Sequence, residues 1–218
     1  DAGTPDPNGG VIRRRENSSE PNGVLEESAS TAARTKLPPV GLEETLDSLK
    51  YAMTYYASNG ITTVQDGAVI GAQRPMLDEA ARRGLLPLDV VTYHMWTPVM
   101  LDLRTFNNSR SYDRGLKHYG VKLILDGSPQ GKTAFLSQPY FKPPVGKPAN
   151  YVGYPTLPAD AVTKAVSEAA ARDIPVLAHA NGDAAAEMLI NAVAAVRQAN
   201  PSARPDVVMI HAQTVRDD

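Results

Sequence analysis

The sequence contains no cysteine among its 218 residues. It therefore forms no disulfide bonds and binds no metal through thiolates, although this absence fits a reducing and an oxidising compartment equally well. It also has no stretch that is apolar enough to span a bilayer. The formal net charge of −2 provides no positive field that could hold a polyanion. We therefore expect neither a nucleic-acid partner nor a membrane partner.

A nucleotide-binding loop is missing too, although "VKLILDGSPQGKT" (121–133) looks like one at first. A P-loop needs a glycine, four residues, then Gly-Lys-Ser/Thr opening into a helix. The first glycine would fall on Asp126, and the glycine stands one residue later. The segment that follows carries prolines at 139, 143, 144 and 148, so it forms no long helix. The lysine of interest is therefore Lys122 rather than Lys132.

Residues 1–40 are rich in Gly, Pro, Asn, Ser and Glu and show no sustained period. This composition predicts an extended, loop-like arm. The basic cluster Arg13–Arg15 within it is expected to be a solvated loop. The chain opens on "DAGTPDPNGG", which resembles neither a signal peptide nor a natural start, so we expect it to be a piece of a longer protein.

Helical and strand patterns alternate from residue 41 onward. The spacing of apolar residues predicts helices over 41–60, 75–86, 110–120, 158–173 and 184–200, and strands over 61–67, 88–95, 121–127, 175–183 and 205–213. This order is typical of an α/β fold with a parallel sheet of right-handed βαβ units. Both an open doubly wound sheet and a (β/α)8 TIM-type barrel fit it. The lack of a Gly-rich turn after the first strand disfavours a dinucleotide-binding sheet.

Polar side chains stand at the ends of the predicted strands: Asp66, His94, Asp126, His179 and His211. In a barrel these ends meet at one mouth, where ligands bind. An unpaired polar group buried there costs about 1–3 kcal/mol, so two histidines on successive strands favour a functional interpretation. Imidazole is the commonest metal ligand. Both a metal site and a plain polar rim fit the His179–His211 pair.

Lys122 favours the metal site. It shares a strand face with Ile124 and Asp126 by the period of two, and a bare ammonium inside a barrel is costly. One interpretation is a salt bridge with Asp126. The other is that CO2 carbamylates the amine and turns it into an anionic metal ligand.

Five segments together carry a family resemblance: "GVKLILDGSPQGKTA", "HANGDAA", "IHAQ", "GITTVQDG" and the arm "DPNGGVIRRRENSSEPNGVLEESA". In this order they resemble the amidohydrolase superfamily and, within it, the YtcJ-like type-3 amidohydrolases. The resemblance covers nearly the whole chain. It implies a metal-dependent hydrolase on a (β/α)8 barrel that cleaves C–N bonds of small amide or formamide-like substrates. It also implies a divalent metal cofactor, expected to be zinc, with one or two ions in the intact enzyme.

The resemblance also implies a ligand set. Such enzymes use a His-x-His pair on the first strand, a lysine carbamate on the fourth, one His each on the fifth and sixth, and an Asp on the eighth. Lys122 matches the carbamylated lysine, His179 the fifth-strand His and His211 the sixth-strand His. No His-x-His is present, and no sequence after Asp218 supplies the last strands. We therefore expect residues 41–218 to form an incomplete barrel, roughly strands 2 to 6, that by itself binds metal weakly and catalyses poorly or not at all.

A non-catalytic alternative stays open, in which the chain is a barrel-derived module that binds a small ligand or a partner chain. Open strand edges seek partners, so self-association of the chain is expected. The segment 127–154 is either a substrate lid or a packed surface insertion. Asp183 either helps to hold the site or caps its helix, and the cap is the favoured expectation. His118 is expected to lie in a helix, at the surface or in packing.

Overall fold

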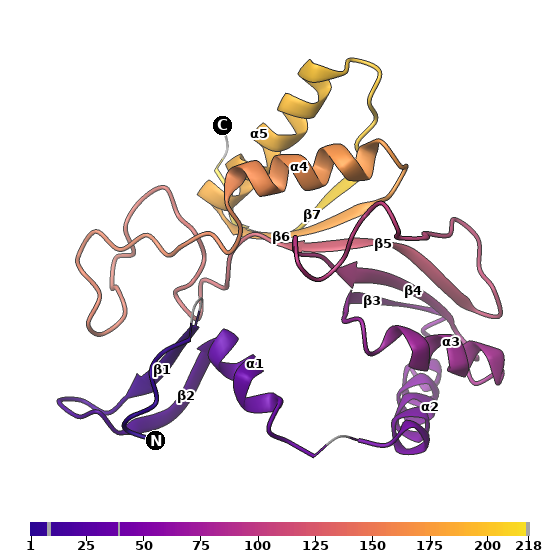
Figure 1. Ribbon diagram of the computed structural model, residues 1–218, viewed down its shortest axis with the longest axis horizontal. Coiled ribbons are helices and arrows are strands. Elements are labelled where there is room, and N and C mark those ends of the chain that lie inside the picture. Colours follow the sequence, from indigo (N-terminus) through magenta and orange to yellow (C-terminus); the bar gives the residue numbers. More distant parts are fainter. Residues whose placement is uncertain (8–9, 39, 217–218) are drawn as a thin grey trace. The chain divides into compact units, whose positions relative to one another are not determined.

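The structure is a computed structural model that describes residues 1–7, 10–38 and 40–216 (Figure 1). The chain divides into two compact units, Asp1–Gly41 and Leu42–Asp218. In the first unit, β1 (Gly10–Arg14) pairs antiparallel with β2 (Pro21–Glu27), and α1 (Ser28–Arg34) follows. The expectation of a loop-like arm was therefore wrong in its local structure.

The hairpin was missed because its two strands are short. Only a few apolar residues alternate along β1 and β2, too few to stand out among the surrounding turn residues. Arg13 lies in β1, where its Nε donates to Glu26 on β2 at 2.6 Å. Asn17 adopts the left-handed backbone of the turn, with φ 53°. Arg13 and Arg14 of the basic cluster are consequently part of a strand, and Arg15 lies exposed in the turn after it.

The second unit is a five-stranded parallel sheet in the order β3-β4-β5-β6-β7. It curls into a half-barrel, which confirms the predicted α/β fold and the incomplete TIM-type barrel. The strands are β3 (Thr63–Val69), β4 (Asp89–Met95), β5 (Leu116–Ile124), β6 (Val176–Gly182) and β7 (Val207–Thr214). The helices are α2 (Leu42–Ser58), α3 (Arg74–Arg82), α4 (Ala159–Ala170) and α5 (Asp183–Ala199). In the described part of the chain, no helix combines the length and apolar character needed to cross a bilayer.

One predicted helix is a turn and a strand instead. Residues 110–120 show spaced apolar residues, but Arg114 and Gly115 have positive φ values of 48° and 82°, which end any helix there. β5 begins immediately afterwards at Leu116 and adds its first residues to the sheet beside β4. β5 therefore begins earlier than the strand that the sequence pattern predicted over 121–127.

The main hydrophobic core lies between the sheet and the helices α4 and α5, which run along one face of β5, β6 and β7 (Figure 1). Val121 and Leu123 of β5 face this core, and Leu123 is fully buried against residues such as Val166 and Leu189. A second, smaller core packs α2 and α3 against β3 and β4. Because side chains alternate along a strand, the residues between these core positions face the inner side of the half-barrel.

Gly120 tests how tightly β5 packs. A Cβ at this position would lie 2.3 Å from the carbonyl oxygen of Pro175 and 2.9 Å from the ring of Tyr93. The backbone carbonyl cannot move aside cheaply, so Gly120→Ala should lower the free energy of unfolding by about 3 kcal/mol. Urea-induced unfolding measures this. Gly71→Ala is the control, since nothing lies within 4 Å of its Cβ, and an equal effect of both substitutions would contradict the packing argument.

The open edges β3 and β7 give a second expectation. The sheet's described strands leave one side of each without a neighbour, and Val208 on β7 is 48% exposed. Unpaired edges with apolar side chains recruit further strands. We expect the isolated chain to form dimers or larger species. Light scattering at micromolar concentration measures this, and a monomer would count against the expectation.

Candidate metal centre

Lys122 stands on the inner face of β5, between the core residues Val121 and Leu123. Its side chain is buried, at 5% exposure. Burial lowers its pKa to about 8 because an apolar environment disfavours the ammonium ion. Among the described residues its amine has neither a hydrogen-bond acceptor nor a carboxylate partner, so the salt bridge with Asp126 considered from the sequence is not formed.

His179 lies on the inner face of β6, because Ala178 and Ala180 on either side of it pack into the helix-covered core. Its Nε2 is 3.1 Å from the carbonyl oxygen of Gly127 and 3.4 Å from a carboxylate oxygen of Asp126. A carbonyl only accepts, so we assign the ring proton to Nε2. The lone pair is then on Nδ1, and this is the usual state of a metal-binding imidazole whose other nitrogen donates to a carbonyl.

His211 reaches the same place through an irregular backbone. Met209 on β7 packs against the core under the helices, and simple alternation would turn His211 to that side too. Positive φ values at His211 (76°) and Ala212 (49°) break the alternation. The His211 ring consequently lies edge-on to His179, with 4.4 Å between ring centroids. Left-handed backbone at non-glycine residues is uncommon and concentrates at functional sites.

The register of the strands places the backbone of Lys122 below the two histidines, within the length of a lysine side chain. His179 is opposite Ile124, two residues beyond Lys122, and His211 is opposite Ala180. At about 3.3 Å per residue the backbone of Lys122 lies roughly 7 Å deeper, and the four-carbon stem of lysine spans most of this depth.

Electrostatics support this convergence. Burial lowers the pKa of His211, and the positive charges of His179 and Lys122 lower it further, whereas Asp126 opposes the shift. The charges of His179, Lys122 and Asp126 therefore all act on His211. The structure brings the rings of His179 and His211 together and places Lys122 on the neighbouring strand, two residues before the register partner of His179.

Asp126 has a different task from the one that its place at a strand end suggests. The carboxylate is fully buried and accepts three backbone N–H groups, from Asn181 at 2.9 Å, Phe135 at 2.9 Å and Gly182 at 2.7 Å. Its oxygens therefore fasten the loop after β5 to the end of β6. No simple sequence pattern indicates this, because the donors are backbone groups distant in sequence.

His94 does not face the mouth, which corrects the expectation that all polar strand ends gather there. It shares the outer face of β4 with Val90, which packs in the smaller core. Its Nε2 lies 2.9 Å from Nδ1 of His118 and 3.1 Å from the hydroxyl of Thr92. The alternation Val90-Thr92-His94 was the signal that could have placed it correctly.

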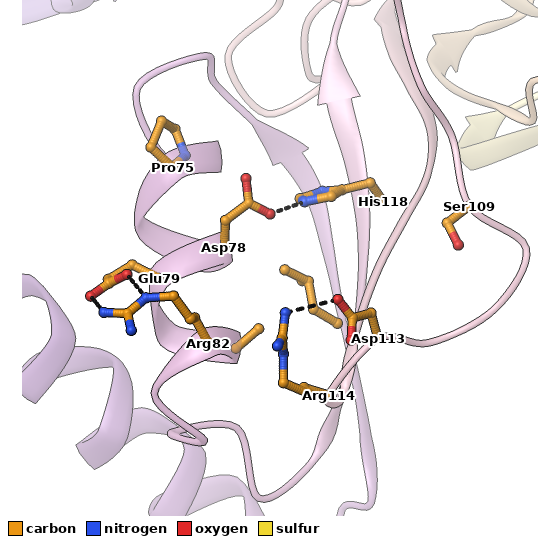
Figure 2. A pocket seen from close by; sticks show the side chains of 10 residues that line it. Pro75, Asp78, Glu79, Arg82, Ser109, Asp113, Arg114 and His118 are labelled. Carbon is orange, nitrogen blue, oxygen red and sulfur yellow. Dashed lines mark hydrogen bonds and ion pairs between the residues drawn. The ribbon is translucent and has the colours of Figure 1, made fainter.

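His118 is in β5 rather than in a helix, and it lines a separate cavity of about 520 Å³ between α3 and β5. Figure 2 shows Asp78 of α3 directed at His118, with Nε2 and the carboxylate 2.8 Å apart. The consecutive residues Asp113 and Arg114 line the same cavity and form an ion pair of 3.0 Å with each other. None of the three candidate ligands borders it, so the outer cavity and the inner centre are distinct.

The candidate metal centre has a set of ligand side chains that includes a lysine. In the described part of the chain, no group of three or more His, Cys, Asp or Glu side chains is arranged to hold a metal ion. The candidate set instead has two imidazoles and one lysine, and an ammonium does not bind a cation. A metal would fit only if Lys122 loses its proton or becomes an anion.

Comparison with known proteins decides the family. The model described as "Amidohydrolase family" matches residues 1–218. This chain belongs to the amidohydrolase family. Membership of this family supports a hydrolase role and agrees with the resemblance carried by the strand-end segments.

Individual relatives agree. YtcJ of Bacillus subtilis (strain 168), whose name describes it as an amidohydrolase, is 26% identical over 197 residues, which are 87% of this chain and 35% of YtcJ. A crystal structure of an uncharacterized metal-dependent hydrolase from Pyrococcus furiosus superposes with a TM-score of 0.73 at 26% identity, covering 89% of this chain and 39% of that one. Another from Pyrococcus horikoshii OT3 gives 0.70 at 25% identity, covering 95% and 41%. This amidohydrolase chain therefore spans about two fifths or less of the length of these relatives.

The outer histidine pair generates a pH prediction. Burial lowers the pKa of His94 to about 4, the charges of His118 and Arg74 lower it further, and Asp78 opposes them. An unfolded histidine titrates near 6.5, so between these values the unfolded chain binds one more proton than the folded chain. The stability contributed by neutral His94 is complete above pH 6.5 and is lost as the pH falls towards 4.

We expect the free energy of unfolding to fall by about 2 kcal/mol between pH 7 and pH 5 from this residue alone. Urea unfolding at both pH values measures the change. In His94→Gln the same acidification should cost about 2 kcal/mol less. If wild type and variant lose equal stability, His94 is not the group that titrates.

Proposed function

We propose that this chain supplies part of the metal centre of a hydrolase that cleaves C–N bonds of amide or formamide-like substrates. Lys122, His179 and His211 are the proposed ligands, with Lys122 as a carbamate. The observation that supports the proposal is a buried lysine without a counter-charge on the strand next to two imidazoles whose ring centroids are 4.4 Å apart.

The residues fit a divalent metal by their chemistry. A pKa of about 8 for Lys122 leaves roughly a tenth of its amine neutral at pH 7, against well under a hundredth for an ordinary lysine. A neutral amine nitrogen bonds to the carbon of CO2 and releases a proton, which leaves a carbamate anion. The product replaces a costly buried cation by an oxygen ligand. Together with the imidazoles of His179 and His211 it makes a nitrogen and oxygen donor set that zinc accepts.

Each residue then has a defined part. His179 and His211 present imidazole lone pairs on the inner face, and the proton on Nε2 of His179 stays with the carbonyl of Gly127. Asp126, held by three backbone donors, keeps that carbonyl and the end of β6 in place. A bound divalent metal would supply Lewis acidity, lowering the pKa of water and polarising a substrate carbonyl. The described residues lack the His-x-His pair and the last-strand Asp of the set that the family resemblance implies. Our proposal therefore assigns the remaining ligands and the general base to groups outside the described residues.

The metal assignment is tested by Lys122→Ala in the natural protein that carries this chain. We expect about one or two zinc ions per chain in the wild type and a loss of most of this metal in the variant, measured by elemental analysis. Lys117→Ala is the matched control, since Lys117 lies in the same strand but its amine stacks on Tyr112 and Tyr119.

Chemical rescue sharpens this test. Added acetate or formate should restore part of the metal content of Lys122→Ala, because a small carboxylate can occupy the space left by the carbamate. Full metal retention without any addition would remove Lys122 from the ligand set.

The bond specificity is tested separately. N-acyl and N-formyl amines should release free amine with the zinc-loaded natural protein, whereas matched phosphate esters should stay intact. Turnover of phosphate esters alone would contradict the C–N assignment. Stable metal binding without turnover of any carbonyl substrate would support the non-catalytic alternative.

A further inference from the structure

Asp183 occupies a junction that no ligand assignment explains. It is the first residue of α5 and is 8% exposed. The cap position belongs to Gly182, so the expectation that Asp183 caps the helix was wrong. Its carboxylate accepts the backbone N–H of Ser137 at 2.9 Å and the hydroxyl of the same serine. It also pairs with the guanidinium of Arg216 at 2.9 Å.

These contacts join three segments. Ser137 belongs to the long connection between β5 and α4, which has no regular element of its own (Figure 1). Asp183 directly follows β6, and Arg216 lies shortly after the end of β7. The three strands that precede these segments carry Lys122, His179 and His211 in the same order. One carboxylate therefore links a segment that follows each of the three strands with a proposed metal ligand.

The loop after β5 packs so closely against the end of β6 that no Cβ fits at Gly182, where it would lie 1.8 Å from the carbonyl oxygen of Phe135. The loop also packs closely against itself, since a Cβ on Gly153 would lie 1.9 Å from the carbonyl oxygen of Ala134. Asp126 holds the N–H of Phe135 from below. The base of this loop is thus a packed, hydrogen-bonded structure, which favours the packed insertion over a freely moving lid.

The same loop begins with Gly127, whose carbonyl accepts the ring proton of His179. Any shift of the loop relative to β6 would change this hydrogen bond and with it the orientation of the imidazole. Metal-binding histidines depend on such partners, and loss of one typically weakens metal affinity or activity about 10- to 100-fold.

Asp183 stays an anion in this setting. Burial by itself would raise its pKa, but the hydrogen bonds from Ser137 and the one from Arg216 outweigh burial and lower it. Glu187 shares the guanidinium of Arg216 at 3.0 Å on the more exposed side. The junction is therefore charge-assisted, and a neutral amide in place of the carboxylate would weaken it without removing its volume.

We propose that Asp183 is a positioning residue for the metal centre: it fastens the loop that orients His179 and ties it to the segment following His211. This inference rests on the proposed function, because it assumes that these histidines bind a metal. It assigns Asp183 no contact with substrate or metal. Its effect passes through Ser137 and the carbonyl of Gly127.

The test compares Asp183→Asn with Asp160→Asn in the natural protein. Asp160 is the matched control, an exposed acidic residue in the first turn of α4. With Co²⁺ as the probe, we expect Asp183→Asn to bind about 10-fold more weakly, with an altered visible absorption spectrum. With the C–N substrate, kcat should fall about 10-fold or more with little change in KM. Asp160→Asn should match the wild type in all four measurements.

A purely structural role gives a different result. It would lower the melting temperature of Asp183→Asn while leaving Co²⁺ affinity, spectrum and kcat as in the wild type, and that outcome would overturn the proposal. Asp183→Glu, which keeps the charge, should recover part of the Co²⁺ affinity. If Asp183→Asn does not fold, Ser137→Ala decides, because it removes one donor and should shift Co²⁺ affinity in the same direction by a smaller factor.

The two hypotheses fail separately. If Lys122→Ala retains its metal, the proposed function falls whatever Asp183 does. If Lys122→Ala loses its metal but Asp183→Asn and Ser137→Ala both behave as the wild type, only the positioning role falls.

Discussion

The parallel alignment of β5, β6 and β7 is the constraint on which the candidate centre depends. Parallel strands end at the same edge, so the three strands carry Lys122, His179 and His211 towards the same edge of the sheet. Val121 and Leu123 are buried under the helices, and alternation then leaves Lys122 no direction except the inner face. Packing of the hydrophobic core on one side of the sheet thereby buries the amine of Lys122 on the other side. A buried amine without a counter-charge is costly as a cation, and the same burial makes it reactive as a neutral nucleophile.

Backbone groups, rather than side chains, hold this centre in shape. Asp126 accepts backbone N–H groups, and Gly127 supplies a carbonyl to the ring proton of His179. Gly182 allows the loop after β5 to approach within a distance that excludes any Cβ. Carboxylate and carbonyl groups with several fixed partners have one low-energy arrangement, since an unsatisfied partner would be left buried. The polar groups around the candidate centre therefore have a structural task, which is to fix the loop and the strand end in one arrangement.

Sequence reasoning succeeded where one regular period dominated a segment. The amphipathic helices and apolar strands from residue 158 onward were predicted at nearly their observed bounds, because one apolar period dominates each segment there and short turns flank it. It failed where two signals competed. Residues 110–120 have apolar spacing compatible with a helix, but the left-handed turn at Arg114 and Gly115 overrides it. The arm hides a hairpin because its strands are short and its composition is that of turns. His94 was assigned to the mouth from its place at a strand end, whereas its face is set by alternation from Val90.

The sequence alone determined the alternating α/β order and the parallel sheet, and it predicted the three residues that we propose as metal ligands. These follow from local periodicity, from residue chemistry and from a resemblance that short segments carry. Only the tertiary structure decided that Lys122 has no carboxylate partner, that a left-handed backbone turns His211 towards His179, and that Asp183 joins three segments instead of capping a helix. The physical reason is that each of these depends on groups brought together from distant parts of the chain, whose distances and partners are set by packing and leave no periodic trace in the sequence.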